Sequence, residues 1–379
     1  MTSILVVYEQ IDNTVEVNLA AIDTIFNFEG FSVRYALSRD VTDMELNWCD
    51  VCYAIRPSSI YSVNIARAIT ESNRLYISLF DDDLLNLPSS HPSCWRKKYM
   101  LKCLQQSKAV VMCNPLLIED YKKIISSPLY ILSHAFVREE EIKNFVDRKD
   151  KMTIIYPAGK DHTELFERYV MPAMNKLMKN HQNLEVHIMG IDPDLRCSPY
   201  QNRVIRHAAR PLKDYIQFMR EHDFCIGVAP LNNDNFSNRK YFIKYIDYAR
   251  FGIAGIYSSC MPYTQVVKHG ENGLLVENTI DSWEWAINSL IENDYLRKAI
   301  VENSQKDIRL NFSLESVRNK LFDDLQPLFE NKPMKKNLCL KYNFISSFIF
   351  DQISNYHRLK AHIDAEGVVK TLDKIIMKA

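Results

Sequence analysis

The chain has 379 residues, more than one hydrophobic core usually holds, so two domains are the default expectation. Its 47 basic and 47 acidic residues leave no overall field that would attract nucleic acid or an anionic membrane, so any such attraction must be local. The nine cysteines show no disulfide-like framework, which predicts reduced thiols and a cytoplasmic location.

The first 137 residues alternate strand and helix signals. The first apolar run, Ile4–Tyr8, is too short for a signal peptide, and no later segment reaches about 18 uninterrupted apolar residues. The apolar runs are typical of buried parallel strands. The predicted strands are Ser3–Tyr8, Ser32–Ala36, Val51–Ile55, Leu75–Phe80, Ala109–Asn114 and Leu129–His134, and the predicted helices include Val15–Phe28 and Pro115–Ile124. This alternation predicts a doubly wound α/β domain over residues 1–137.

Charged residues follow two of these strands, at the edge where ligands of parallel sheets bind. Arg56 could meet an anionic substrate group there, or be an ordinary surface arginine. The next strand ends in Asp81, Asp82 and Asp83, which repel one another unless a cation, a donor or solvent offsets them. One use is an Asp-x-Asp pair that holds a divalent metal on a sugar-nucleotide diphosphate. The others are a carboxylate that acts on an acceptor hydroxyl, and a capped, solvated turn.

A highly charged stretch without strand character, residues 138–151, predicts a linker, and a second α/β domain follows over 152–310. Its predicted strands are Met152–Tyr156, Leu184–Met189, Val204–His207, Phe224–Ala229 and Ile253–Tyr257. Its predicted helices are Thr163–Asn180, Pro211–Glu221, one from about Lys240 to Arg250, and two between Thr279 and Ser304.

Two loops of this domain are candidates for phosphate binding. Gly159, Lys160 and His162 follow the first strand, where small residues let the backbone approach a ligand and the lysine adds positive charge. A structural hydrogen-bonding role for His162 is the alternative. The backbone around Pro262 and Tyr263 could bind the second half of a diphosphate, or form a plain turn.

The helix between the last two predicted strands carries the strongest indication of a ligand-binding site. Ser237 and Asn238 are predicted to cap it, with Lys240 in its first turn and Lys244 and Asp247 further along the same face. Because cations are disfavoured at a helix start, two lysines there suggest a negatively charged ligand such as a pyrophosphate. A solvated face with one ordinary salt bridge explains the spacing equally well.

This helix and its flanks resemble the nucleotide-sugar half of the GT-B glycosyltransferases, above all the retaining group-1 (family 4-like) enzymes of bacterial surface polysaccharide synthesis. The resemblance rests on K-Y-F-I-K-Y-I-D-Y-A-R-F-G-I-A-G-I-Y-S-S, on the Pro-Tyr pair that follows and on G-E-N-G-L-L-V. The family's two acidic residues, seven residues apart, normally face the donor sugar and the nucleotide ribose. Here Arg239 falls on the first position and Asp247 on the second. One branch of the family has the arrangement of Lys240, Lys244 and Asp247.

Two further segments extend the resemblance. The stretch S-L-F-D-D-D-L-L-N-L-P is similar to a motif of the same branch, which favours Asp82 as the carboxylate that acts on the acceptor. Gly159 and His162 match the family's G-S-x-x-H loop. The departure at Arg239 bears on the donor-sugar contact and on the class of donor.

The resemblance implies an α/β protein of GT-B architecture, with two Rossmann-like domains facing across a cleft, a helix over 311–332 that crosses back to the N-terminal domain, and a helical extension. It implies that Lys240 and Lys244 neutralise the leaving diphosphate without a metal or other cofactor, while Asp247 holds the ribose. A glycan or lipid-linked acceptor would dock on the N-terminal domain, and hinge closure would bring Asp82 and Arg56 to the sugar. The rival hypotheses are a metal-dependent transferase that uses the Asp-x-Asp pair and a catalytically silent scaffold of a polysaccharide-assembly complex.

The tail over residues 333–379 combines lysines with aromatic and aliphatic residues at helical spacing. Such a helix can lie on an anionic bilayer, where a lipid-linked acceptor would be found. It can equally pack on its own chain or on a partner subunit. The prediction is therefore a cytoplasmic protein, with association to the inner face of the membrane through the tail as one option.

Overall fold

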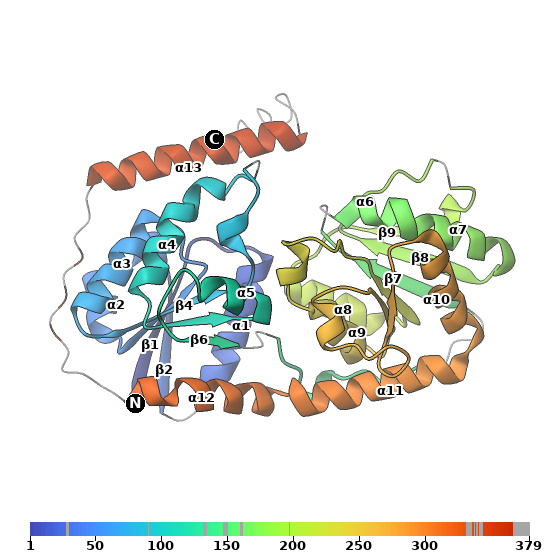
Figure 1. The fold of residues 1–379 in the computed structure, drawn as a ribbon, viewed down its shortest axis with the longest axis horizontal. Coiled ribbons are helices and arrows are strands. Elements are labelled where there is room, and N and C mark those ends of the chain that lie inside the picture. Colours follow the sequence, from blue (N-terminus) through green and yellow to red (C-terminus); the bar gives the residue numbers. More distant parts are fainter. Residues whose placement is uncertain are drawn as a thin grey trace. The chain divides into compact units, whose positions relative to one another are not determined.

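The computed structural model describes residues 1–27, 30–89, 91–131, 135–146, 151–159, 162–196, 198–330, 336, 338, 340 and 344–366. The chain forms two compact units (Figure 1). Unit 1 comprises Met1–Leu132 and Phe322–Ala379, and unit 2 comprises Ser133–Leu321. None of the helices in the described part of the chain has the length and apolar content that a membrane span requires.

Unit 1 contains a six-stranded parallel sheet in the order β2-β1-β3-β4-β5-β6. Its strands are β1 (Thr2–Tyr8), β2 (Phe31–Leu37), β3 (Val51–Ile55), β4 (Leu75–Phe80), β5 (Ala109–Met112) and β6 (Leu129–Ile131). Its first five helices are α1 (Asn13–Phe26), α2 (Asp43–Trp48), α3 (Ile60–Glu71), α4 (Lys97–Gln106) and α5 (Pro115–Tyr121). Strand β3 is buried along its whole length, as expected for a central parallel strand with both faces covered by helices.

Unit 2 repeats the architecture with a six-stranded parallel sheet in the order β12-β11-β10-β7-β8-β9. The strands are β7 (Met152–Pro157), β8 (Leu184–Met189), β9 (Val204–His207), β10 (Ile226–Ala229), β11 (Ala254–Ser258) and β12 (Leu274–Val276). The helices are α6 (Thr163–Leu165), α7 (Met171–Asn180), α8 (Leu212–Glu221), α9 (Ile243–Arg250), α10 (Ile280–Glu292) and α11 (Asp294–Asn311). Its core joins the central strands to α7, α10 and α11 and contains the fully buried Trp283.

The structure differs from the sequence-based prediction in three local features. The predicted helix over 163–180 contains a π-helical turn, Phe166–Val170, between α6 and α7. Strand β6 ends at Ile131, and the predicted end, His134, lies outside the described residues. The described part of the predicted linker packs on unit 2, because the Lys143 backbone N–H donates to the Arg250 carbonyl (2.7 Å) and its ammonium lies 2.6 Å from the Asp223 carboxylate.

Two C-terminal helices complete unit 1. Helix α12 (Leu314–Glu330) begins in unit 2 and ends in unit 1. Its rings Phe322 and Phe329 pack edge-on against Phe26 of α1, with ring centroids 5.8 and 6.4 Å away. Helix α13 (Phe344–Glu366) is the helical extension and lies along α3 and α4 of the same unit (Figure 1).

Candidate active site

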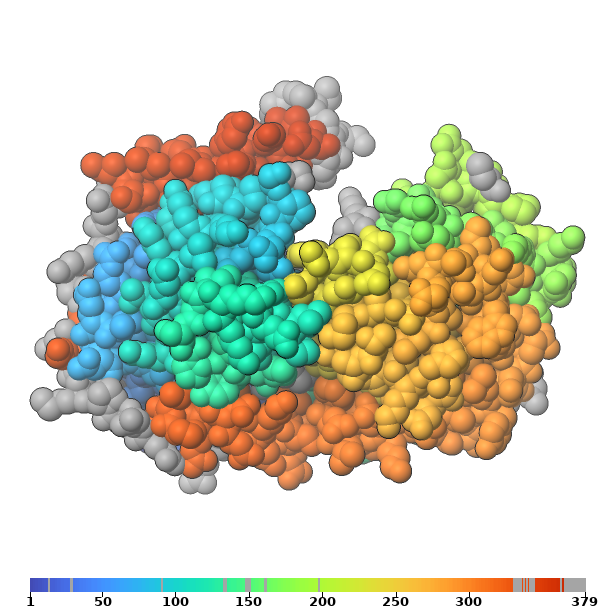
Figure 2. Space-filling view, in the orientation of Figure 1, coloured from blue at the N-terminus to red at the C-terminus, as the bar shows by residue number. Residues whose placement is uncertain are grey.

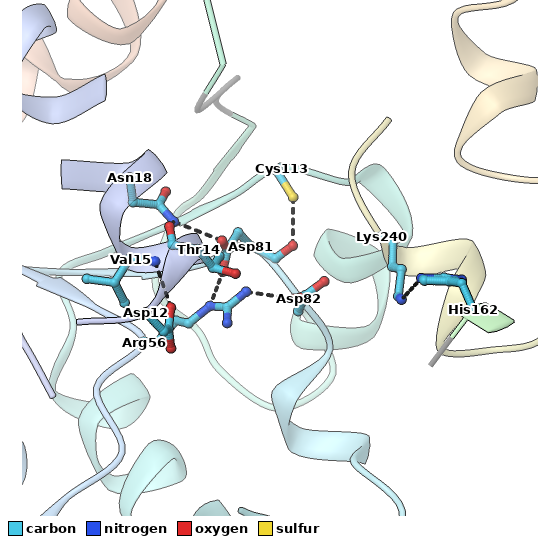
Figure 3. Close-up of polar contacts among 10 residues, drawn as sticks. All are labelled: Asp12, Thr14, Val15, Asn18, Arg56, Asp81, Asp82, Cys113, His162 and Lys240. Carbon is cyan, nitrogen blue, oxygen red and sulfur yellow. Dashed lines mark hydrogen bonds and ion pairs between the residues drawn. The ribbon is translucent and has the colours of Figure 1, made fainter. Parts of the chain in front are cut away.

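Arg56 and Asp82 form one ion pair at the carboxyl edge of the unit 1 sheet. Arg56 directly follows β3 and adopts a left-handed backbone conformation, with φ of 48°, which is uncommon for a residue other than glycine. Its guanidinium donates through Nε to Asp81 and through Nη2 to Asp82 Oδ2, the latter at 2.6 Å (Figure 3). Burial lowers the pKa of Arg56, but the two carboxylates raise it by more, so the pKa lies above its usual value.

The three aspartates that follow β4 have different environments. Asp81 is buried, its Oδ2 accepts from Asn18 Nδ2 of α1 (2.9 Å), and its backbone carbonyl accepts from the Cys113 thiol (2.9 Å; Figure 3). Burial and the neighbouring carboxylates hold the pKa of that thiol well above its usual value. Asp83 is buried and accepts from the side-chain amide of Asn86. The side chain of Asp82 is 28% exposed against 3% for Asp81, so Asp82 is the carboxylate open to a ligand.

This arrangement answers two questions left open by the sequence. Arg56 is an inward-facing ion-pair partner, not a surface arginine, and its charge is already opposed by two carboxylates. The aspartates are not a solvated turn, because Asp81 and Asp83 are buried. Among the residues that the structure describes, no three His, Cys, Asp or Glu side chains gather as a metal-binding group.

The loop after β7 contributes His162 to a contact within unit 2. His162 Nε2 lies 3.1 Å from the ammonium nitrogen of Lys240 (Figure 3). Because an ammonium only donates, Nε2 accepts and the imidazole proton lies on Nδ1. Gly159 is described, whereas Lys160 lies outside the described residues. The loop runs close to β8, since a Cβ on Gly190 would stand 2.4 Å from the Ala158 carbonyl oxygen.

The predicted start of the central helix is wrong. Helix α9 begins at Ile243, and Ser237–Arg239 form a separate 3₁₀ turn. Lys240 has an extended backbone, with φ of −68° and ψ of 166°, so it does not lie in a first helical turn. Phe242 occupies the N-cap position with no side-chain cap, because its ring is buried against Phe312, with centroids 5.5 Å apart.

The predicted caps make other contacts. The Ser237 backbone N–H donates to the Asp234 carboxylate (2.7 Å), and the Asn238 side-chain amide donates to Asn233 (2.9 Å). Packing of an aromatic side chain therefore outweighs the capping preference of the polar residues at this helix end.

Lys244 lies in the first turn of α9 and is the most distinctive group of unit 2. It is half-buried, and among the described residues its ammonium has no hydrogen bond and no ion pair. The nitrogen lies 5.6 Å from the centroid of the Tyr215 ring. Burial lowers the pKa of Lys244, and the nearby Asp247 offsets only part of this effect. A desolvated cation without a partner is unfavourable, so the position is suited to an anionic ligand.

The other predicted donor-site residues are engaged in different ways. Asp247 is buried and accepts from the Tyr215 hydroxyl at 3.1 Å. Arg239 donates to the Asn235 carbonyl at 2.7 Å. Pro262 precedes a short 3₁₀ turn, and Tyr263 is buried against Tyr257, with ring centroids 4.9 Å apart. The Tyr263 side chain is thus part of the core, which leaves the backbone of that turn for any ligand.

Several site residues were missed by sequence reasoning. Asn18 and Cys113 fix Asp81, and Tyr215 fixes Asp247, although each comes from a distant element. The sequence offers one signal, an asparagine at helical spacing from Val15 and Ile22, and its burial in the structure agrees with a hydrogen-bonding role. Cys113 and Tyr215 look like ordinary core and surface positions in the sequence.

Comparison with known proteins places the fold. No protein-family model and no curated protein sequence matches the chain. Among solved structures, it is similar to a glycosyltransferase from Rickettsia africae, with 14% identity, a TM-score of 0.65, and coverage of 87% of this chain and 99% of that one. It is also similar to HepE of Anabaena in complex with UDP-glucose, with 12% identity, a TM-score of 0.66, and coverage of 86% and 100%.

TarM is a third structure with this similarity, at 14% identity and a TM-score of 0.55. The match covers 72% of this chain and 54% of TarM, so the chain spans about half the length of that protein. Two doubly wound parallel units in one chain, together with these similarities, identify the fold as that of the GT-B glycosyltransferases.

Proposed function

We propose that the chain is a glycosyltransferase that moves a sugar from a nucleotide-activated donor to a glycan or lipid-linked acceptor. The observation that carries the proposal is Lys244, a half-buried ammonium without an ion pair in the described part of the chain, on a helix of a GT-B fold. HepE, which shares the fold, was crystallised with UDP-glucose. Retention of the anomeric configuration and a role in bacterial surface polysaccharide synthesis complete the proposal.

Unit 2 binds the donor in this proposal. Lys244 and Lys240 neutralise the charge of the diphosphate, and His162 orients Lys240 through the 3.1 Å contact. Asp247, held by Tyr215, accepts hydrogen bonds from the ribose hydroxyls. The backbone at Gly159 and at Pro262 and Tyr263 contributes N–H donors to the phosphates, Lys160 adds charge, and Arg239 faces the donor sugar.

Unit 1 binds the acceptor. The bond between the anomeric carbon and the diphosphate oxygen breaks, and its electron pair leaves with the diphosphate. The acceptor hydroxyl oxygen forms the new bond to that carbon, and Asp82 accepts the hydroxyl proton. Arg56 holds Asp82 in place through the 2.6 Å contact. The lysines supply the positive charge that a metal ion provides in other transferases, so the proposed reaction needs no metal.

The protonation of Lys244 gives the proposal a pH dependence. Because burial lowers the pKa of Lys244 in the free protein, the amine loses its proton at a lower pH than an ordinary lysine. A bound diphosphate favours the ammonium, so nucleotide binding takes up protons at alkaline pH. Titration calorimetry in buffers of different ionisation enthalpy detects this uptake, and Lys244→Ala abolishes it.

A thermal-shift screen tests the donor site. Sugar nucleotides and free nucleotides, each with EDTA or magnesium, are added to the wild type, to Lys244→Ala and to Lys213→Ala, which alters an exposed lysine of α8. A ligand at a hundred times its dissociation constant stabilises by about 2.7 kcal/mol, or several degrees. A metal-independent shift in the wild type and in Lys213→Ala, but not in Lys244→Ala, supports the donor site. A shift only with magnesium favours the Asp-x-Asp hypothesis, and binding without turnover favours the silent scaffold.

A further inference from the structure

Helix α13 has two apolar faces, of which unit 1 covers one. On the covered face Phe350 is buried, with its ring centroid 5.2 Å from Trp95, 5.1 Å from Tyr99 and 6.1 Å from Tyr61. Ser354, one turn further, accepts from Arg96 Nη2 at 2.9 Å. The helix is therefore docked on α3, on α4 and on the turn before α4 (Figures 1 and 2).

The second apolar face points away from these contacts. We call it the outer stripe and define it as Ile345, Phe348, Ile349, Tyr356 and Leu359, which are 41% to 69% exposed. Successive spacings of three, one, seven and three residues place all five on one side of the helix, opposite Phe350 and Ser354. Large apolar side chains exposed in a row on one helix mark an interaction surface, because isolated exposed residues are normal but clusters are not.

The charge around the outer stripe indicates what covers it. Between Leu84 and Ile118 the chain has five basic residues and no acidic residue, although its overall formal charge is zero. This segment includes the turn and helix on which α13 lies. Lys98 and Lys102 are exposed on α4, close in sequence to the ring contacts of Trp95 and Tyr99. The acidic residue nearest the stripe, Asp351, accepts from Tyr61 at 2.8 Å and so faces unit 1.

We propose that the outer stripe of α13, together with the exposed Lys98 and Lys102 of the helix on which α13 packs, binds the surface of an anionic lipid bilayer. An amphipathic helix of this kind lies in the plane of the interface, with its apolar side chains inserted among the acyl chains and with basic neighbours at the lipid phosphates. A tyrosine within an aliphatic stripe fits the same depth, since its ring is apolar and its hydroxyl remains hydrated. The inference does not depend on the proposed activity, and its test needs no turnover.

Vesicle co-sedimentation of the full chain tests the proposal. The probes are phosphatidylcholine vesicles with and without about one third phosphatidylglycerol. The stripe variant is Phe348→Ser with Ile349→Ser. Its matched control is Tyr295→Ser with Leu310→Ser, which removes an exposed aromatic and an exposed aliphatic residue from α11. Circular dichroism and thermal unfolding verify that both variants fold as the wild type does.

We expect the wild type and the control to bind the anionic vesicles and the stripe variant to bind at least about tenfold more weakly. Reversal of Lys98 and Lys102 to glutamate weakens binding further, by about fivefold for each lysine, whereas reversal of the exposed Lys213 and Lys268 does not. Weaker binding to vesicles of phosphatidylcholine alone is also expected.

Three results would overturn the proposal. The first is a wild type that binds neither kind of vesicle. The second is a stripe variant that binds as well as its control. The third is light scattering that shows a wild-type dimer without vesicle binding and a monomeric stripe variant, which assigns the stripe to a second copy of this chain.

Discussion

At the sheet edge of unit 1, Arg56 is held between Asp81 and Asp82, whereas in unit 2 Lys244 is half-buried and has no ion pair among the described residues. Both cations sit where parallel strands lead into loops or helices, yet one is neutralised by its own chain and the other is not. An internally paired cation fixes the geometry of its carboxylates, while an unpaired one is available for an external anion. The difference separates an edge whose charges are paired within the chain from an edge at which we propose that an anionic ligand binds.

Removal of the Lys244 ammonium is the most direct test of the difference between the two units. Lys244→Ala is expected to lower kcat by roughly 10²- to 10³-fold, because the charge that develops on the leaving diphosphate loses its nearest neutralising group. Steady-state turnover of the donor measures the loss. Lys213→Ala, on the exposed face of α8, serves as the control, and comparable losses in the two variants would contradict the assignment.

Substitutions of two neighbouring aspartates of unit 1 should have different effects, one mainly on stability and the other mainly on activity. Asp81→Asn leaves the buried part of the ion pair without its charge and is expected to lower the free energy of unfolding by about 3 kcal/mol. Asp82→Asn, with a more exposed side chain, should lower it by about 1 kcal/mol or less but reduce kcat strongly. Urea unfolding and turnover measure the two effects. Equal changes in both properties would remove the distinction between the two residues.

The cost of burying a titratable group can also be measured at His187 of unit 2, whose Nδ1 lies 3.0 Å from His207 Nε2. Burial, followed by the charge of His207, lowers the pKa of His187 from 6.5 to about 4, although Glu185 opposes the shift. The unfolded chain therefore binds this proton first as the pH falls, so stability is complete above pH 6.5 and declines below it.

The expected loss of unfolding free energy between pH 7 and pH 5 is about 2 kcal/mol. Urea unfolding at a series of pH values measures it, and His187→Asn should remove most of this dependence. Substitution of the exposed His269 should leave it unchanged. An imidazole resonance of His187 that titrates near 6.5 would contradict the prediction.

The smallest effect concerns the hydroxyl that holds Asp247. Tyr215→Phe removes one hydrogen bond of 3.1 Å to a buried carboxylate and should cost about 1 kcal/mol of donor affinity. We expect a higher KM for the donor with kcat nearly unchanged, since the ribose lies away from the reacting bond. Ser289→Ala, on the exposed side of α10, is the control, and an altered kcat in Tyr215→Phe would place the hydroxyl closer to the chemistry.

The sequence predicts the bounds of four strands, because each is a short stretch rich in apolar side chains. Val51–Ile55, Leu75–Phe80, Leu184–Met189 and Val204–His207 agree residue for residue with β3, β4, β8 and β9. Three of these stretches follow Asp50, Arg74 and Asn183 and precede Arg56, Asp81 and Gly190, so both of their ends are visible in the sequence. The position of Arg56 beside the aspartates also follows, because the carboxyl ends of neighbouring parallel strands share one edge.

The sequence does not predict which side chains pair. The contact between Asn18 and Asp81 depends on how α1 packs on the sheet. The pairing of Arg56 with Asp81 and Asp82 depends on the side-chain conformations at the sheet edge. The start of α9 was wrong for a similar reason, since burial of Phe242 displaces the helix start to Ile243. Local helix and capping propensities predict helix ends poorly wherever a tertiary contact contributes more free energy.

The discontinuity of unit 1 has a consequence for biosynthesis. All of unit 2 is encoded between residues 133 and 321, so it can fold as soon as that contiguous stretch has left the ribosome. The first segment of unit 1 precedes unit 2 in the chain, but α12 is completed and α13 is made only after all of unit 2. Until then the Phe26 and Phe31 rings, which Phe322 and Phe329 cover in the finished protein, stay open to water and to other nascent chains. The unit whose synthesis begins before that of unit 2 is thus completed after it, and chaperones that bind exposed aromatic residues would find their target there.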